Sequence, residues 1–154
     1  MMRSVLIICA VVCAGVSFIG PLYSHCEIPC GIYDDDARVE MMKEHTRTIE
    51  KSMNYIIDLQ KQESIDRNQL VRWIVNKEDH ANKLQDIVTQ YFLTQRVPPV
   101  EEDGDAGYGK YNRQLRLLHQ IMVQAMKAKQ TTDVKHVKKL RQLIDEFHDV
   151  YFHE

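Results

Sequence analysis

The chain has 154 residues, of which 27% are charged and 44% are hydrophobic, a composition typical of a single globular domain. Its formal net charge is -2 and its pI is about 6.4. A protein that wraps nucleic acid needs a clustered basic face, and this charge balance supplies no such reservoir, so we do not expect a nucleic-acid partner. The few prolines and glycines leave long uninterrupted segments, which favours helices.

The first 24 residues resemble a secretory leader. Arg3 precedes an uncharged run from Val5 to Phe18, and Ser24 supplies a small residue before the expected cut. We predict that a maturation peptidase cleaves between Ser24 and His25, and that the processed chain is exported from the cytoplasm without a membrane attachment. Secretion, a periplasm and an organelle lumen all fit. The alternative is an uncleaved anchor, because the apolar run approaches the roughly 20 residues that span a bilayer.

Cleavage also reduces the cysteine count. Cys9 and Cys13 lie in the leader, so the mature chain keeps only Cys26 and Cys30. A disulfide between these two would close so small a loop that it would remove little chain entropy and would join no separate parts of the fold. A structural role for this pair is therefore weakly supported.

The remainder, residues 34–154, predicts an all-α fold, an antiparallel up-down four-helix bundle. Apolar residues recur at alternating steps of three and four in segments that begin near Asp34, Asp66, Tyr108 and Thr131 or Thr132. The positions expected to face inward are Val39, Met42, Thr46, Ile49, Met53, Ile56 and Gln60; Leu70, Ile74, Lys77, Ala81, Leu84, Val88 and Tyr91; Tyr111, Leu115, Leu118, Met122 and Ala125; and Val137, Leu140, Ile144, Phe147 and Tyr151.

Further apolar residues lie beside these stripes, and we expect part of this surplus to face other subunits. They are Val71, Trp73, Leu117, Ile121 and Leu143. The histidines of the bundle form no metal-binding motif and are expected at surface or boundary positions, on separate helices or at the chain end. They are His45, His119, His136, His148 and His153.

The chemistry lies in the segment 25–33, which reads His-Cys-Glu-Ile-Pro-Cys-Gly-Ile-Tyr. Pro29 and Gly31 favour a tight hook over a helix. Cleavage after residue 24 would expose an α-amine with a pKa of about 8 beside an imidazole and two thiols. Such nitrogen and sulfur donors suit tetrahedral zinc, or nickel(II) or copper(II) if the hook flattens the ligands. A disulfide between Cys26 and Cys30 in a flexible terminus remains an alternative.

This hook resembles the nickel superoxide dismutases, whose mature chains begin with His-Cys-x-x-Pro-Cys-Gly-x-Tyr. Every fixed position is matched, and weaker similarity continues through residues 37–40, 77–78 and 91–92. The resemblance implies a homohexamer of bundles that converts superoxide into oxygen and hydrogen peroxide by nickel(II)/nickel(III) cycling. It also implies that a nickel ion is bound by the His25 amine and imidazole, the Cys26 thiolate and backbone nitrogen, and the Cys30 thiolate.

The resemblance implies four further catalytic residues around the metal. Tyr33 would stand over the open axial face where superoxide approaches, and Tyr91 would be a second tyrosine near the pocket. Glu40 would orient the axial imidazole, and His80 falls where the family pattern places an arginine beside that imidazole.

Two other hypotheses remain open at this stage. The chain could be a secreted helical interaction module with a terminal disulfide and no activity, or a passive nickel or copper carrier that uses the same hook. Metal analysis and thiol counting separate the enzyme from the interaction module, and turnover separates it from the carrier.

Overall fold

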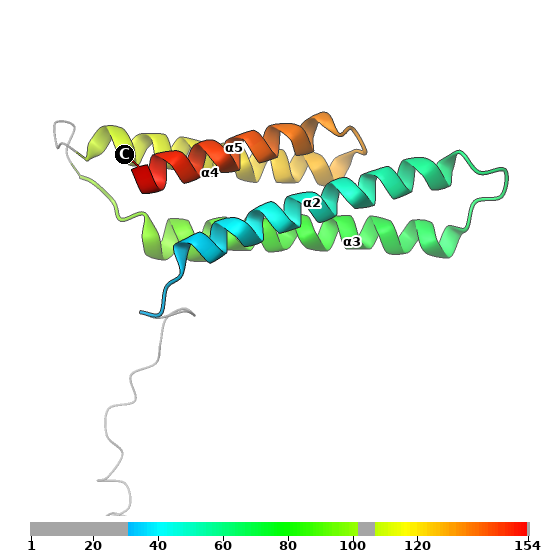
Figure 1. The fold of residues 1–154 in the computed structure, drawn as a ribbon, viewed down its shortest axis with the longest axis horizontal. Helices are drawn as coiled ribbons and strands as arrows, with labels where there is room; N and C mark the ends of the chain where they lie inside the picture. The colour runs from blue at the N-terminus through cyan, green and yellow to red at the C-terminus, as the bar shows by residue number, and fades with distance from the viewer. Residues whose placement is uncertain (1–30, 102–106, 154) are drawn as a thin grey trace, which may run out of the picture. The chain divides into compact units, whose positions relative to one another are not determined.

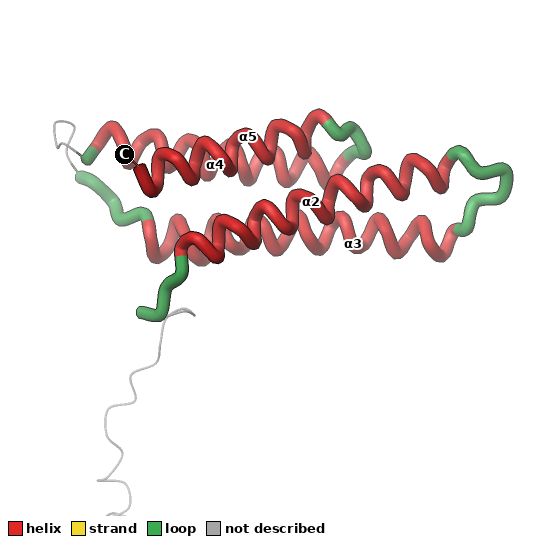
Figure 2. The backbone as a smooth tube through the Cα atoms, in the orientation of Figure 1, coloured by secondary structure: helices red, strands yellow, loops and turns green. Residues whose placement is uncertain are grey.

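The computed structural model describes residues 31–101 and 107–153; the leader and the hook up to Cys30 lie outside the described residues. The described part contains four helices and no strand, which confirms the predicted all-helical class (Figure 2). The chain divides after Ile32 into two units, and the second, Tyr33–Glu154, holds all of these helices. Within the described ranges, no helix combines the length and the apolar character needed to cross a membrane.

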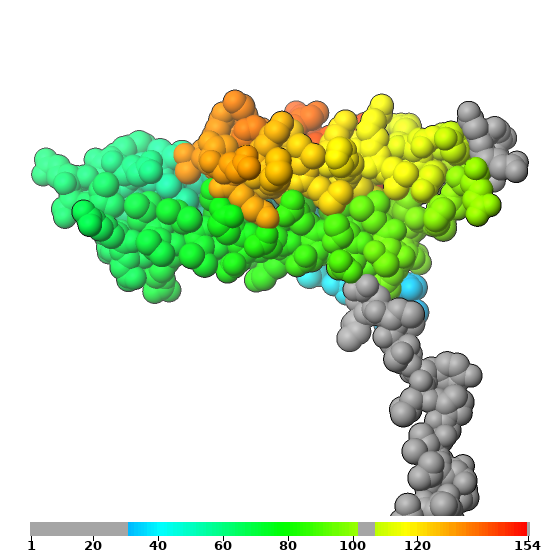
Figure 3. Space-filling view, turned by 180° about the vertical axis from the view of Figure 1, so that it is seen from behind, coloured from blue at the N-terminus to red at the C-terminus, as the bar shows by residue number. Residues whose placement is uncertain are grey.

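The four helices surround one apolar core (Figure 1). They are α2 (Asp35–Gln60), α3 (Arg67–Asp86) with its direct continuation as the π-helix η1 (Ile87–Arg96), α4 (Tyr108–Gln130) and α5 (Lys135–His153). Both α2 and α4 pack against α3 and α5, and Figure 3 shows α3 and α4 side by side. Each helix therefore covers one side of the core and contributes an apolar stripe to it, as predicted.

Capping side chains fix where the helices begin. The Asp34 carboxylate accepts a hydrogen bond from the Ala37 backbone N–H at 3.0 Å, as the acidic start of this segment predicted. The expected start of α5 near Thr131 or Thr132 was wrong, because the helix begins at Lys135. The first turn is closed by Asp133, whose Oδ1 accepts from the Lys135 N–H at 3.0 Å, while the Thr131 hydroxyl accepts from the N–H of Asp133 itself.

Two positions predicted to face inward are exposed, Gln60 and Ile74. Lys77 reaches the last carbonyl groups of α4, so the part of α3 before Lys77 extends beyond the end of α4. Figure 1 shows the same region, where the connected ends of α2 and α3 project past α4 and α5. An inward stripe has no second layer to cover it there, and it stays exposed.

The surplus apolar residues of α4 and α5 belong to the core of the chain itself, so they are not the part of the surplus that was expected to face other subunits. Leu117, Ile121 and Leu143 are at most 1% exposed. The buried face of α4 thus includes Leu117 and Ile121, and the predicted positions Tyr111, Leu115 and Met122 lie at its edge, partly buried. By contrast, Val71 on α3 is 57% exposed.

Candidate metal centre

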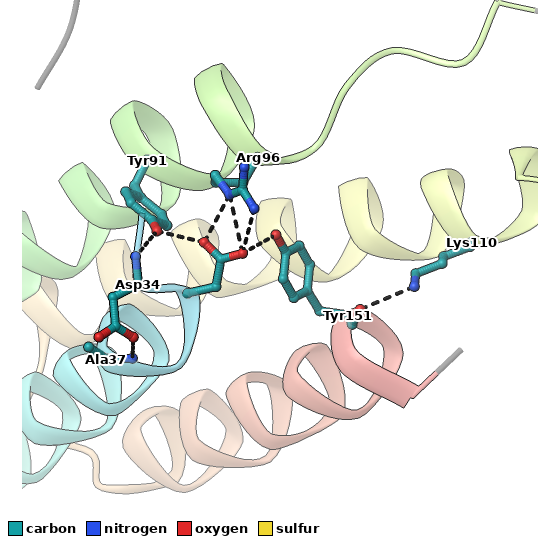
Figure 4. Close-up of polar contacts among 7 residues, drawn as sticks. Asp34, Ala37, Tyr91, Arg96, Lys110 and Tyr151 are labelled. Atoms are coloured by element: carbon teal, nitrogen blue, oxygen red, sulfur yellow. Dashed lines mark hydrogen bonds and ion pairs between the residues drawn. The ribbon is translucent and has the colours of Figure 1, made fainter. Parts of the chain in front are cut away.

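One carboxylate, that of Asp35 in the first turn of α2, joins three helix ends. Its Oδ1 accepts a hydrogen bond from the Tyr91 hydroxyl at 2.6 Å, and its Oδ2 accepts one from the Tyr151 hydroxyl at 2.8 Å. The Arg96 guanidinium donates Nε to Oδ1 at 2.9 Å and Nη2 to Oδ2 at 2.8 Å, a bidentate pair (Figure 4). Asp35 therefore ties the start of α2 to the ends of η1 and α5, directly after the segment that carries the hook.

The π-helix explains how Tyr91 and Arg96 reach the same carboxylate although they are five residues apart. In an α-helix, about 100° per residue would place them roughly 140° apart around the axis. Backbone hydrogen bonding in η1 instead links residues five apart, and the Val97 N–H donates to the Phe92 carbonyl at 2.9 Å. The wider turn brings the two side chains to one side of the helix.

This network sets the protonation states of its own side chains. Burial raises the pKa of the Asp35 carboxyl, but hydrogen bonds from Arg96 and the two tyrosines outweigh it and hold that pKa below its ordinary value. Burial, together with the hydrogen bond to Asp35, raises the pKa of Tyr91 and that of Tyr151 to about 12. At neutral pH the carboxylate is therefore ionised and both phenols keep their protons.

The structure brings the two predicted tyrosines together. The Tyr33 ring lies edge-on to Tyr91 with 5.9 Å between centroids, and Tyr33 is 40% exposed. Two guanidinium groups cover these rings, that of Arg96 at 4.3 Å from the Tyr33 centroid and that of Arg38 at 5.0 Å from the Tyr91 centroid. Tyr33, the last residue of the hook, is thus held against the bundle by an edge-to-face ring contact and a cation–π contact.

The other two predicted site residues lie elsewhere on the bundle. Glu40 is exposed and forms an ion pair with Lys43 at 3.1 Å. His80 precedes Tyr91 by eleven residues, roughly 16 Å along a helix. In the part of the chain that the structure describes, neither Glu40 nor His80 forms a hydrogen bond, ion pair or ring contact with Tyr33 or Tyr91. Their orienting roles stay predictions.

His80 pairs with His45 across α2 and α3, a contact that the expectation of dispersed surface histidines did not anticipate. The two Nδ1 atoms lie 3.0 Å apart and the rings are nearly perpendicular. A hydrogen bond between two Nδ1 atoms requires one ring to carry the proton there and the other to lack it, so the rings are opposite tautomers. Burial lowers the pKa of both imidazoles, which favours the neutral pair.

Sequence reasoning missed three members of the network: Asp35, Arg96 and the hydroxyl of Tyr151. A run of acids such as Asp34 to Asp36 at a helix start predicts capping oxygens and favourable charge, but no inward partner. One cap needs one carboxylate, and the excess of acids was the available signal that another acid has an inward partner. A periodicity of 3.6 residues does not indicate a π-helix. The sequence therefore carries no sign that Arg96 and Tyr91 reach the same carboxylate.

The fold and the hook define an all-helical metalloenzyme, and comparison with known families identifies which one. A sequence model of the nickel-containing superoxide dismutases matches residues 21–154, so the chain belongs to that family. No curated protein and no solved structure matches the chain. The chain is therefore an oxidoreductase that converts superoxide into oxygen and hydrogen peroxide, with nickel as its cofactor. The interaction-module and passive-carrier hypotheses receive no support.

The donor types of the hook fit nickel. An imidazole and two thiolates, with the α-amine that cleavage before His25 would add, are the nitrogen and soft sulfur donors that bind late first-row metals well. The described end of the hook agrees with a tight turn, because Gly31 has a φ of 78°, a left-handed conformation that glycine adopts without strain. Gly31 thus adopts the positive φ that a glycine permits at this position.

Proposed function

We propose that nickel is held by His25, Cys26 and Cys30 at the start of the mature chain, through the set of groups that the resemblance implies. The single observation that carries this proposal is the family match over residues 21–154, which includes the whole hook. Bound nickel supplies one-electron chemistry, because it alternates between the divalent and trivalent states.

Tyr33 is the phenol available to substrate in this proposal. Its hydroxyl has no hydrogen-bond partner among the described residues, and its ring is partly exposed. Tyr91 is different, because its hydroxyl donates to Asp35 and accepts from the Asp34 N–H at 3.0 Å. Tyr91 therefore keeps its proton and positions Tyr33, while Tyr33 can guide superoxide and pass the protons that peroxide needs. The neighbouring positive charge of Arg38 favours the approach of an anion.

We propose that Glu40 and His80 act through other groups, by orienting the imidazole of His25. A ligand imidazole needs a partner on its second nitrogen, which fixes its tautomer and its direction. The contact with His45 supports this role for His80, because it occupies the Nδ1 of His80 and leaves Nε2 as the nitrogen that can face a partner.

We propose that the chain assembles as a homohexamer of antiparallel up-down bundles. The short connections at residues 61–66 and 131–134 support the up-down path. The projecting end of α2 and α3 supports assembly, because large apolar side chains are exposed there, a pattern typical of protein contacts. These side chains, each at least 40% exposed, are Tyr55, Ile65, Val71, Ile74 and Val75.

Residues 1–24 are proposed to be a leader that a maturation peptidase removes, which exports the chain and exposes the amine of His25. The leader lies outside the described residues, and its cationic start and apolar centre support this proposal. The domain plan is then a leader at 1–24, a nickel-binding hook at 25–33 and a four-helix bundle at 34–154.

The test of the ligand set is substitution of the cysteines. Cys26→Ser and Cys30→Ser should each lose nickel and dismutase activity together, because a hydroxyl is a poor replacement for a thiolate. Circular dichroism should show an unchanged helical bundle. Cys13→Ser is the matched control, since its cysteine leaves with the leader and the mature protein is unaltered. A Cys26→Ser or Cys30→Ser protein with full nickel content and turnover would contradict the proposed site.

A further inference from the structure

We propose a second metal site on the bundle, at the end of α5, that binds a late divalent transition-metal ion. His148, Asp149 and His153 each offer a ligand atom, and these atoms all lie within 4.8 Å of one another. Asp36 of α2 adds a nearby negative charge, with its Oδ1 3.4 Å from Nε2 of His148, the ring nitrogen opposite the one that faces Asp149. The site therefore takes its three ligands from α5 and shares none with the hook.

The spacing is close to that of a bound ion. Metal–ligand bonds of about 2.0–2.2 Å in a tetrahedron separate the ligand atoms by roughly 3.4 Å. The Oδ1 of Asp149 already lies 3.6 Å from the Nδ1 of His148. The widest separation has to close by about 1 Å, which small rotations of the exposed side chains of Asp149 and His153 supply.

Charge and packing both favour a cation here. The end of a helix carries partial negative charge on its free carbonyl groups, and two carboxylates add to it. His148 is only partly exposed and stacks at 4.7 Å on the ring of Phe152, so the central ligand is held in place. Two imidazoles with carboxylates select zinc, nickel or copper over magnesium or calcium.

Occupancy of this site would reach the network around Asp35. Tyr151, which donates to Asp35, lies between the two histidines on α5. A metal that joins His148 to His153 therefore fixes the last turn of α5, which carries Tyr151. Since binding to the folded state alone stabilises it, the metal should raise the unfolding temperature.

Zinc titration of a mature chain that carries both Cys26→Ser and Cys30→Ser tests the proposal, because the hook thiolates are absent. Calorimetry should find a saturable zinc site, and zinc should raise the unfolding temperature. His148→Ala and His153→Ala should each weaken zinc binding by at least about 10-fold, since loss of a ligand should cost no less than loss of its supporting partner. His119→Ala, at an exposed histidine of α4, is the matched control and should change nothing.

Three results would overturn the inference. The first is a hook variant that binds no zinc. The second is zinc binding that His148→Ala leaves unchanged. The third is binding that His80→Ala abolishes, which would place the ion at the pair formed with His45. The nickel content of the wild-type hook does not enter these measurements, so failure here leaves the proposed active site untouched.

Discussion

Replacing Asp35 with asparagine tests the network that holds Tyr91 and, through Tyr91 and Arg96, anchors Tyr33. Asparagine keeps the shape of the side chain but removes its charge, and its amide nitrogen cannot accept from Tyr91, Tyr151 or Arg96. A hydrogen bond to a charged group contributes about 1.5–3 kcal/mol. The donors share one acceptor, so their contributions do not add fully. We expect a loss of about 3 kcal/mol, which lowers the unfolding temperature of a chain of this size by roughly 10 °C.

The assay is thermal and denaturant unfolding of the mature protein at neutral pH, followed by circular dichroism. Asp36→Asn is the matched control, because it removes a charge from the same helical turn while its side chain is 74% exposed. That control should fall within about 0.5 kcal/mol of wild type. Loss of Asp35 should also let the ring of Tyr33 move, so the fluorescence of the tyrosines should change in Asp35→Asn alone.

The pH dependence gives the refuting result. The pKa of Asp35 is lowered in the folded state, so its contribution is present above the unfolded value of about 3.9 and disappears as the pH falls through the folded value. The stability difference between wild type and Asp35→Asn should therefore shrink in acid. If Asp35→Asn were as stable as Asp36→Asn at neutral pH, or if the difference persisted unchanged in strong acid, the reasoning would be wrong.

Two further predictions concern buried polar groups. Because the folded-state pKa of both Tyr91 and Tyr151 is raised to about 12, their contribution should be intact below pH about 10 and lost as the pH rises towards 12, and Tyr151→Phe should flatten this alkaline loss of unfolding temperature. The buried ammonium of Lys77 donates to carbonyl groups that end α4, so Lys77→Met should cost about 2 kcal/mol in denaturant unfolding. Exposed Lys138→Met should cost almost nothing, and equal losses in the two lysine variants would refute the capping role.

The sequence predicted the helices well because burial has a period that a sequence displays. Val39, Met42 and Ile49 are fully buried as their spacing required. The same reasoning failed for Leu117 and Ile121, because a wide apolar face does not reveal how much of it the chain covers by itself. It failed for Ile74 because α3 extends beyond the end of α4, so no helix covers the inward face of α3 there.

The candidate site divides in the same way. The hook could be proposed from the sequence because the donors of a metal site stand at fixed spacing within one short segment, and this information is local. The contacts of Asp35 and of the pair His45 and His80 were not predictable, because each joins positions distant in sequence through the register of two helices. The π-helix that turns Arg96 towards Asp35 has no local signature of its own in the pattern of apolar residues.

The central claim is that the amine of His25 is a nickel ligand, and the identity of the first residue tests it most directly. Two proteins should be compared side by side for nickel content and superoxide dismutation: one that begins at His25, and one that carries a single extra glycine before it. The extra residue converts the amine into an amide while every side chain remains. We predict full activity and nickel in the first protein and loss of nickel-dependent dismutation in the second, with equal helical content. Full turnover by the extended protein would contradict the account.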